Sequence, residues 1–468
     1  MTLSVNDAEA SGFLNARFGA DHGTPVGANP FSIYFNPAAI TGAKGTQLVL
    51  ENTFAYRIAS YDRSASALSP STAQNPQNPT YVEANTGKAT IGNFLALPFI
   101  GVTSSDLAPN LTVGVASYVP FGGIANWGKN DTFKSGAGAN RAPGAYDGQV
   151  RWHSISGSII TLYNTAAVAY KIPSAGLSFG VNASLVYHRL ETIRARNING
   201  SDDVVTDSGG PLEGRSLLEA SGFNASVAAG VMWEPNRDVR VGLSYTSRPA
   251  FGQMRLKGKL DVVLPTIANA YNVDVTQTYP DVIRLGGAYN VTPELELRAD
   301  IEYVRWSAFQ RQCVLNRDKT GPDGSEIKCN LYDNGASTYT DDLAIIQVIP
   351  RKWRDAGSLR VGVGYALDED TELFGSVTGD TAASPDTTAD ATFIDAFKLI
   401  GTLGARHFFN KSFALAGSYN HVYFFERTVD GSTLYSGSSP PRPTDSPSAN
   451  GTYNQQILFL NVNGTFYF

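Results

Sequence analysis

The final segment of the chain, residues 454–468, alternates between apolar and polar side chains with a period of two. One face carries Leu458, Leu460, Val462, Gly464, Phe466 and Phe468, and the other carries Asn461, Asn463, Thr465 and Tyr467. Successive side chains of a β-strand point to opposite faces, and a strand of a transmembrane barrel turns an apolar face toward lipid. The segment therefore predicts a membrane-spanning strand that ends at Phe468.

The same alternation recurs after residue 45 and predicts fourteen strands. They lie at 46–58, 89–100, 111–121, 159–172, 176–194, 217–234, 238–262, 278–291, 293–309, 354–367, 369–379, 396–409, 411–426 and 454–468. A helix does not produce this period. Strands of soluble sandwiches usually run about five to six residues, and most of these segments are longer, which favours a barrel. Pro249 could split the segment 238–262 into two.

Short and long connections alternate between the predicted strands. The long ones lie near 59–88, 122–158, 195–216, 263–277, 310–353, 380–395 and 427–453. Short periplasmic turns and long outer loops are typical of outer-membrane barrels. An even number of strands then places both termini on the periplasmic side. The predicted fold class is all-β: a 14-stranded antiparallel transmembrane β-barrel.

Residues 1–45 differ from the rest, because they are rich in glycine, alanine and asparagine and contain Pro25, Pro30 and Pro37. They predict a compact N-terminal hatch that enters the barrel 46–468 from the periplasmic side. Its apolar side chains either line a ligand pocket or only pack the hatch against the wall, and the sequence leaves both open. They are Phe13, Phe18, Phe31, Ile33, Tyr34 and Phe35.

Composition narrows the possible functions. Charged residues make up 17% of the chain and no run of 18 apolar residues occurs, so a transmembrane helix is not expected. The net charge of −6 argues against a nucleic-acid partner.

The only cysteines, Cys313 and Cys329, lack the spacing of a zinc site and predict a disulfide within one loop, with free thiols as the alternative. No secretory signal follows Met1, so we expect a processed mature form.

Catalytic or metal-binding groupings are not evident, and we expect neither enzymatic activity nor a cofactor. The five histidines are scattered and have no nucleophile, acid or metal-ligand spacing around them. Three arginines are candidates for binding a carboxylate head group, because a guanidinium offers two parallel donors: Arg17, Arg189 and Arg284. Pairing with neighbouring carboxylates is the alternative role for each of them.

Both ends of the chain resemble known sequences. Phe468, with Phe466 on the same face, resembles the C-terminal signal by which the barrel assembly machinery recognises outer-membrane barrels. Asn15–Arg17, Gly19–Ala20 and Ser32–Ile40 resemble the hatch of the FadL/TodX family of hydrophobic-compound transporters. In that family an asparagine-proline-alanine motif ends the hatch just before the first strand, and Asn36, Pro37 and Ala38 stand at that place. Further similarities follow in order at Asn164–Lys171, Gly242–Tyr245, Leu285–Tyr289 and Asp300–Ser307.

The resemblance implies that a lipophilic ligand is captured from outside, held in an apolar interior pocket and released sideways through a kink in the third strand. In this chain that strand contains Pro120, which cannot donate to the ladder, and is weakened by Gly114 and Gly122. Our hypothesis is that this strand, facing the turn 36–38, is a lateral gate. No cofactor is implied.

The sequence thus predicts an outer-membrane transporter for long-chain fatty acids or other hydrophobic small molecules, which acts by gated passive diffusion. An accessory barrel of the same family, binding a partner in a secretion or surface complex, is the alternative. A general porin is disfavoured because a hatch would block free flow.

Overall fold

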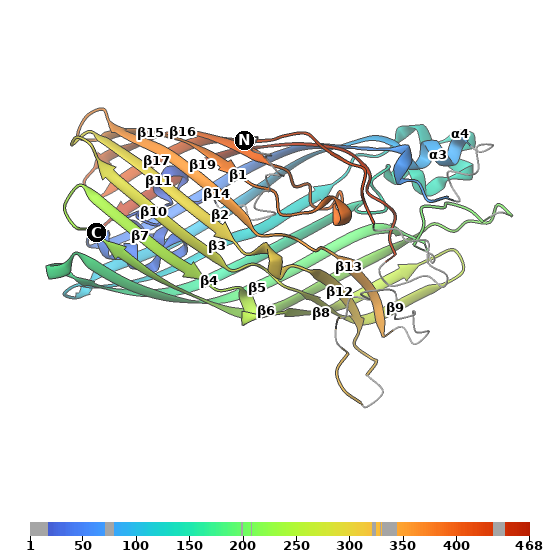
Figure 1. Cartoon of the computed structure of the whole chain (residues 1–468), viewed down its shortest axis with the longest axis horizontal. Helices are drawn as coiled ribbons and strands as arrows, with labels where there is room; N and C mark the ends of the chain where they lie inside the picture. The colour runs from blue at the N-terminus through green and yellow to red at the C-terminus, as the bar shows by residue number, and fades with distance from the viewer. Residues whose placement is uncertain are drawn as a thin grey trace, which may run out of the picture.

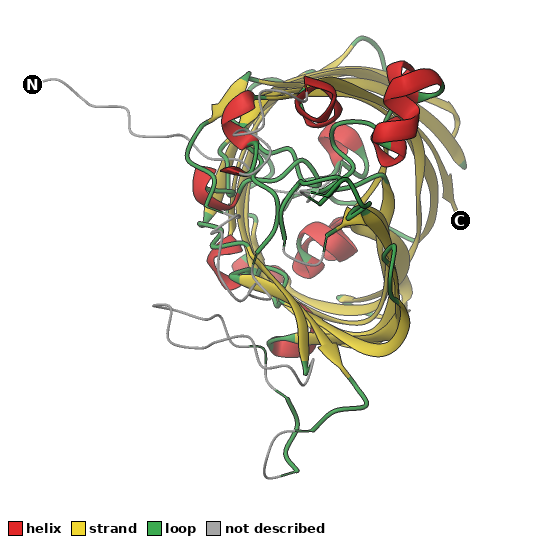
Figure 2. Ribbon diagram, turned by 90° about the vertical axis from the view of Figure 1, so that its right-hand side faces the viewer, coloured by secondary structure: helices red, strands yellow, loops and turns green. Residues whose placement is uncertain are grey.

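The computed structural model describes residues 17–70, 79–197, 200–206, 208–320, 324–327, 329, 344–433 and 445–468. Its strands form one antiparallel sheet that closes on itself, because β1 (Thr46–Arg63) pairs with both β2 (Gly87–Ala108) and β19 (Gly451–Tyr467). Figure 1 shows this barrel from the side and Figure 2 along its length. The predicted antiparallel β-barrel is confirmed.

Fourteen strands make up the wall, as the sequence predicted. Besides β1, β2 and β19 they are β3 (Leu111–Asn126), β4 (Ser156–Ile172), β5 (Leu177–Arg196), β6 (Gly214–Trp233), β7 (Val239–Thr246), β10 (Val282–Asn290), β11 (Leu295–Val304), β14 (Ala356–Ala366), β15 (Thr371–Asp380), β16 (Lys398–Asn410) and β17 (Phe413–Phe424). The short turns between these strands lie at one end of the barrel, which we call the short-turn end. The C-terminus lies there too, opposite the loop helices α3 (Pro79–Asn85) and α4 (Gly136–Arg141) (Figure 1).

Five further strands continue the wall beyond short interruptions. They are β8 (Met254–Val263), β9 (Ala268–Gln277), β12 (Arg311–Asn316), β13 (Ile345–Pro350) and β18 (Arg427–Val429). Pro249 does split the predicted segment 238–262, because it begins the short helix η7 between β7 and β8. The prediction that 263–277 and 310–353 are only loops is wrong, since β9, β12 and β13 lie within them. Their apolar runs are short, and burial of Val273, Val275 and Val314 in one cluster stabilises them.

Cys313 of β12 is joined to Cys329 by a disulfide, with a Cα–Cα distance of 5.9 Å. The bond closes part of the connection between β12 and β13. It therefore lies in the extension of the wall at the long-loop end.

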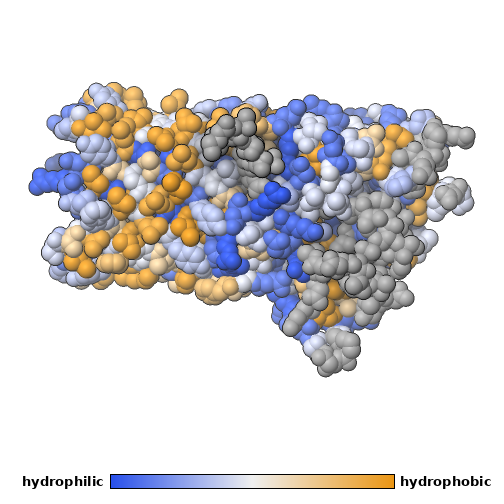
Figure 3. Space-filling view, in the orientation of Figure 1, coloured by the Kyte–Doolittle hydropathy of each residue, from blue (hydrophilic) through white to orange (hydrophobic). Residues whose placement is uncertain are grey.

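The outer face of the wall is apolar. On β5, Phe179, Val181 and Leu185 are about half exposed, whereas the intervening Gly180 and Asn182 are buried inside. Figure 3 shows apolar side chains gathered over the part of the molecule that carries the short turns, with hydrophilic side chains beyond it. This distribution is typical of a wall that faces lipid.

No helix among the described residues is long and apolar enough to cross a membrane.

The described N-terminal segment, residues 17–45, lies inside the barrel, where helical and loop segments fill the ring of strands (Figure 2). It consists of η1 (Ala20–His22), α1 (Ser32–Phe35) and η2 (Pro37–Gly42), joined by irregular backbone. Pro37 begins η2 and the side chain of Asn36 caps it, which explains why a helix starts there. The remaining short helices are η3 (Ala65–Ala67), η4 (Asp131–Phe133), η5 (Pro143–Asp147), η6 (Pro173–Ala175), η7 (Pro249–Phe251), η8 (Trp306–Ala308) and η10 (Asp386–Thr388).

Candidate functional site

The turn at residues 36–38 is bound tightly to the inside of the wall. The Asn36 Nδ2 group donates to the carbonyl oxygens of Pro25 (2.8 Å) and Val231 (3.1 Å), while its Oδ1 accepts from Ala38 N (3.1 Å). A Cβ atom at Gly180 would lie 2.4 Å from Ala38 N, so only glycine permits this approach. The turn thus packs against β5 and β6, and the helix η2 that it begins also contacts β4 and β3. That it faces a lateral gate in the third strand stays a prediction.

The predicted apolar residues of the N-terminal segment form a packed core with the wall. Phe18, Phe31, Ile33, Tyr34 and Phe35 are all buried there. The Phe18 ring lies 5.3 Å from the Phe99 ring, and Ile33 packs against Gly114 of β3. None of these five lines the cavity described below, although Phe31 lines another cavity beside Arg298. All five make packing contacts, and a role in binding a ligand stays a prediction for them. Phe13 lies outside the described residues.

All three candidate arginines are paired with neighbouring carboxylates, and the pair of Arg17 with Asp380 is described with the cavity below. The other two are Arg284 and Arg189. Arg284 donates to the Tyr34 hydroxyl (2.7 Å) and pairs with Glu302 (2.6 Å), which ties the N-terminal segment to β10 and β11. Arg189 pairs with Glu191 and its side chain is 55% exposed. Both therefore have the structural role that the sequence left open as the alternative.

The barrel wall has an interruption between β2 and β3. The two strands pair from Ala108↔Leu111, with an irregularity after Ser104, to Phe99↔Tyr118 and then separate, and the next residue of β2 is Pro98. Beyond that point, residues 87–98 pair only with β1, and residues 121–126 only with β4. We call this opening the β2–β3 gap.

A β-bulge on β3 lies at the start of the gap. Val119 and Pro120 together oppose the single residue Leu162 of β4, and proline has no N–H to donate to β2. Across the gap, Asn93 Nδ2 donates to Ile124 O (2.8 Å), and Gly128 N donates to Thr90 O (3.0 Å). These hydrogen bonds satisfy some of the backbone N–H and C=O groups that have no partner on the other strand. An unpaired backbone group is costly in lipid.

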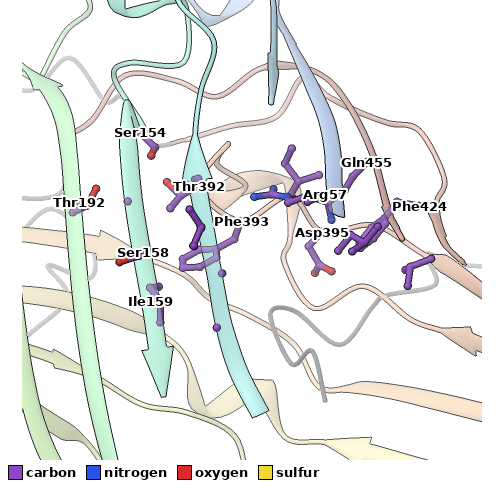
Figure 4. Close-up of a pocket in the computed structure, with 18 of the residues that line it drawn as sticks. Arg57, Ser154, Ser158, Ile159, Thr192, Thr392, Phe393, Asp395, Phe424 and Gln455 are labelled. Carbon is purple, nitrogen blue, oxygen red and sulfur yellow. The ribbon is translucent and has the colours of Figure 1, made fainter. Parts of the chain in front are cut away.

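A cavity of about 130 Å³ adjoins the gap. Gly122, Gly123, Ile124 and Ala125 of β3 form one side of it, and Pro120 lies just before them in the chain. Apolar side chains dominate the opposite side, where Phe393, Ile394, Val422, Phe424, Ile457 and Phe459 lie. Figure 4 shows Phe393, Phe424 and Arg57 around this space.

Three cations line the cavity: Arg17, Arg57 and Lys398. Lys398 and Arg17 share Asp380, at 3.2 and 3.8 Å. Arg57 donates to the Gln455 side chain (2.7 Å) and forms no ion pair with a carboxylate of the described residues. Its positive charge is thus free to attract an anion. Sequence reasoning missed Arg57, although its inward position on β1 followed from the alternation.

Within the described parts of the chain, no group of three histidine, cysteine, aspartate or glutamate side chains is placed to hold a metal ion.

The family profile described as "Outer membrane protein transport protein (OMPP1/FadL/TodX)" matches residues 2–466. A putative outer membrane protein of Neisseria meningitidis serogroup B is 20% identical over 88% of this chain and 84% of its own length. Outer membrane protein P1 of Haemophilus influenzae is 24% identical, over 54% of this chain and 55% of that protein.

Two solved structures share the fold. A FadL homologue of Pseudomonas aeruginosa superposes with a TM-score of 0.73 at 15% identity, over 99% of this chain and 100% of that one. The toluene transporter TodX of Pseudomonas putida gives a TM-score of 0.60 at 13% identity, over 99% of each chain. At such low identity these structures show the fold alone. The profile match spans nearly the whole sequence, and the chain therefore belongs to the OMPP1/FadL/TodX family of outer-membrane channels for hydrophobic compounds.

Proposed function

We propose that this chain carries hydrophobic small molecules inward by gated passive diffusion and releases them sideways through the β2–β3 gap. The observation that carries the proposal is the position of an apolar cavity beside the place where β2 and β3 separate after Phe99↔Tyr118. In this proposal residues 1–45 are the hatch, the barrel spans 46–468 and the short-turn end faces the periplasm. Phe468, which is 78% exposed, remains the predicted recognition point for the assembly machinery.

Lateral release suits a lipophilic ligand energetically. Each buried CH₂ group stabilises the bound ligand by about 0.8 kcal/mol relative to water. A route from an apolar cavity directly into the membrane keeps the apolar surface of the ligand away from water at every step. The polar and charged contacts of the N-terminal segment with the wall, such as Arg360 with the carbonyl oxygen of Gly23 (2.9 Å), disfavour an apolar exit along the barrel axis.

The proposal is tested by comparing uptake with ion conductance. Intact Gram-negative cells that produce the full chain should take up labelled toluene and labelled oleate faster than cells with an empty vector. The purified protein in a planar bilayer should show no steady open channel. A large, steady conductance would instead support a porin, and unchanged uptake of both probes would reject the transport function.

Arg57 suggests a carboxylate-bearing ligand, such as a long-chain fatty acid, as the finer substrate class. Replacing it in Arg57→Gln removes a charge-assisted hydrogen bond worth about 1.5–3 kcal/mol. We expect oleate to bind roughly tenfold to a hundredfold more weakly, while toluene binding stays unchanged. Binding of both probes to the detergent-purified protein measures this.

The matched control is Arg305→Gln, because Arg305 pairs with Asp281 (3.6 Å) and neither residue lines the cavity. If Arg57→Gln binds oleate as tightly as the unmodified protein does, the head group is not held at Arg57. A neutral hydrocarbon would then be the better substrate class.

A further inference from the structure

Phe393 lies on a wall that two cavities share. The first is the cavity beside the β2–β3 gap. The second, of about 60 Å³, lies toward β13 and is lined by Gln347 and Ile349 of that strand. Phe393 and Thr392, together with Ile159, Leu190 and Thr192, line both spaces. In Figure 4 the Phe393 ring is drawn between Ile159 on one side and Arg57 on the other.

The loop that carries Phe393 is fixed at both sides of the ring. Asp390 pairs with Arg351 (2.5 Å) and accepts from Thr392 N (2.6 Å), while Asp395 accepts from Ala383 N (2.7 Å). Burial raises the pKa of Asp390, but the Arg351 guanidinium, His153 and Thr392 hold that pKa below its ordinary value. The Asp390 carboxylate therefore stays ionised and paired at neutral pH.

The ring itself packs against aromatic and charged side chains. Phe393 is half-buried, its ring centre is 6.1 Å from the Trp353 ring, and the Arg351 guanidinium carbon lies 4.9 Å from it. A phenyl group on a fixed backbone changes its position by rotation about its side-chain bonds. Rotation of this one side chain would therefore change the shape of both cavities at the wall that they share.

We propose that Phe393 selects ligands by their cross-section as they pass from the outer of these cavities to the one beside the β2–β3 gap. This inference rests on the proposed transport function and adds the residue that sets its size limit. The property that Phe393 selects is the width of the ligand. The length and the head group of the ligand do not affect selection at this residue. A narrow aromatic passes the ring, and a wider aromatic of the same chemistry is retarded.

The test compares toluene with mesitylene, whose additional methyl groups widen the same ring. Uptake by cells that produce the full chain is measured for the unmodified protein, Phe393→Ala and Phe393→Trp. We expect Phe393→Ala to raise the mesitylene-to-toluene rate ratio about tenfold, and Phe393→Trp to lower it by a similar factor, which is the size of discrimination that small apolar groups provide.

Phe397→Ala is the matched control, because Phe397 ends the same loop, packs on Phe425 at 5.4 Å and lines neither cavity. Heat-modifiable migration of each variant on a gel verifies that the barrel is folded. A rate ratio that is the same in folded Phe393→Ala, folded Phe393→Trp and the unmodified protein would overturn the role of Phe393 while leaving transport intact. Absence of uptake by the unmodified protein would overturn the proposed function, and this inference with it.

Discussion

Gly180→Val is expected to break the seal between the N-terminal segment and the wall. A Cβ atom at Gly180 would lie 2.4 Å from both the Ala38 nitrogen and the Pro37 carbonyl carbon, which are backbone atoms that no rotamer change can move. Overpacking of a buried site costs about 1–3 kcal/mol even where side chains can yield. We therefore expect the turn to leave its position on β5 and β6. The result should be a steady ion conductance in planar bilayers and faster entry of large hydrophilic antibiotics.

Gly401→Val provides the matched control, because a Cβ at Gly401 of β16 meets no atom within 4 Å. Both variants add the same side chain to a wall strand, so lower β-barrel stability alone would affect them alike. Bilayers that stay sealed with folded Gly180→Val would show that the turn at residues 36–38 does not close the barrel. Conductance in both variants would point to the wall itself as the source of the leak.

The alternation of side chains was enough to predict most of the wall, because lipid on one face and a polar interior on the other impose a strict period of two. Segments such as 176–194 agree closely with β5. The alternation of apolar and polar side chains is lost where the wall extends beyond the membrane, because the outer face of the wall does not contact lipid there. The sequence therefore predicts loops where β9, β12 and β13 lie, although Val273 and Val275 of β9 are fully buried.

The candidate site was only partly predictable. Pro120 and Gly122 indicated the weak place in β3, because proline and glycine affect a strand wherever they occur. Pro98 on β2 is likewise a proline within a strand. Only the strand register shows that it directly follows the last β2–β3 pair. The cavity residues Arg57 and Phe393 are far apart in sequence and come together only through barrel closure. The sequence alone therefore gave no reason to place them in one site.

Removal of the bulge is expected to close the β2–β3 gap and to stop lateral release. Deleting Pro120 leaves Val119 opposite Leu162 and preserves the register of Phe121 with Thr161, so the pairing of β3 with β4 is unchanged. Combining the deletion with Pro98→Val restores an N–H on β2 and lets the two strands continue their ladder. Each added hydrogen bond stabilises the closed wall by about 1 kcal/mol. Two or more such bonds should reduce uptake of toluene and oleate by about tenfold or more.

Pro173→Ala, at the short turn between β4 and β5, is the control for loss of a proline from the wall. It should leave uptake unchanged, whereas the closed variant should still bind ligand when purified, since its cavity residues remain in place. Bound ligand without uptake would locate the exit at the β2–β3 gap, because binding and release would then be separated. Normal uptake by a folded closed variant would contradict lateral release, and the ligand would have to leave along the barrel axis past the N-terminal segment.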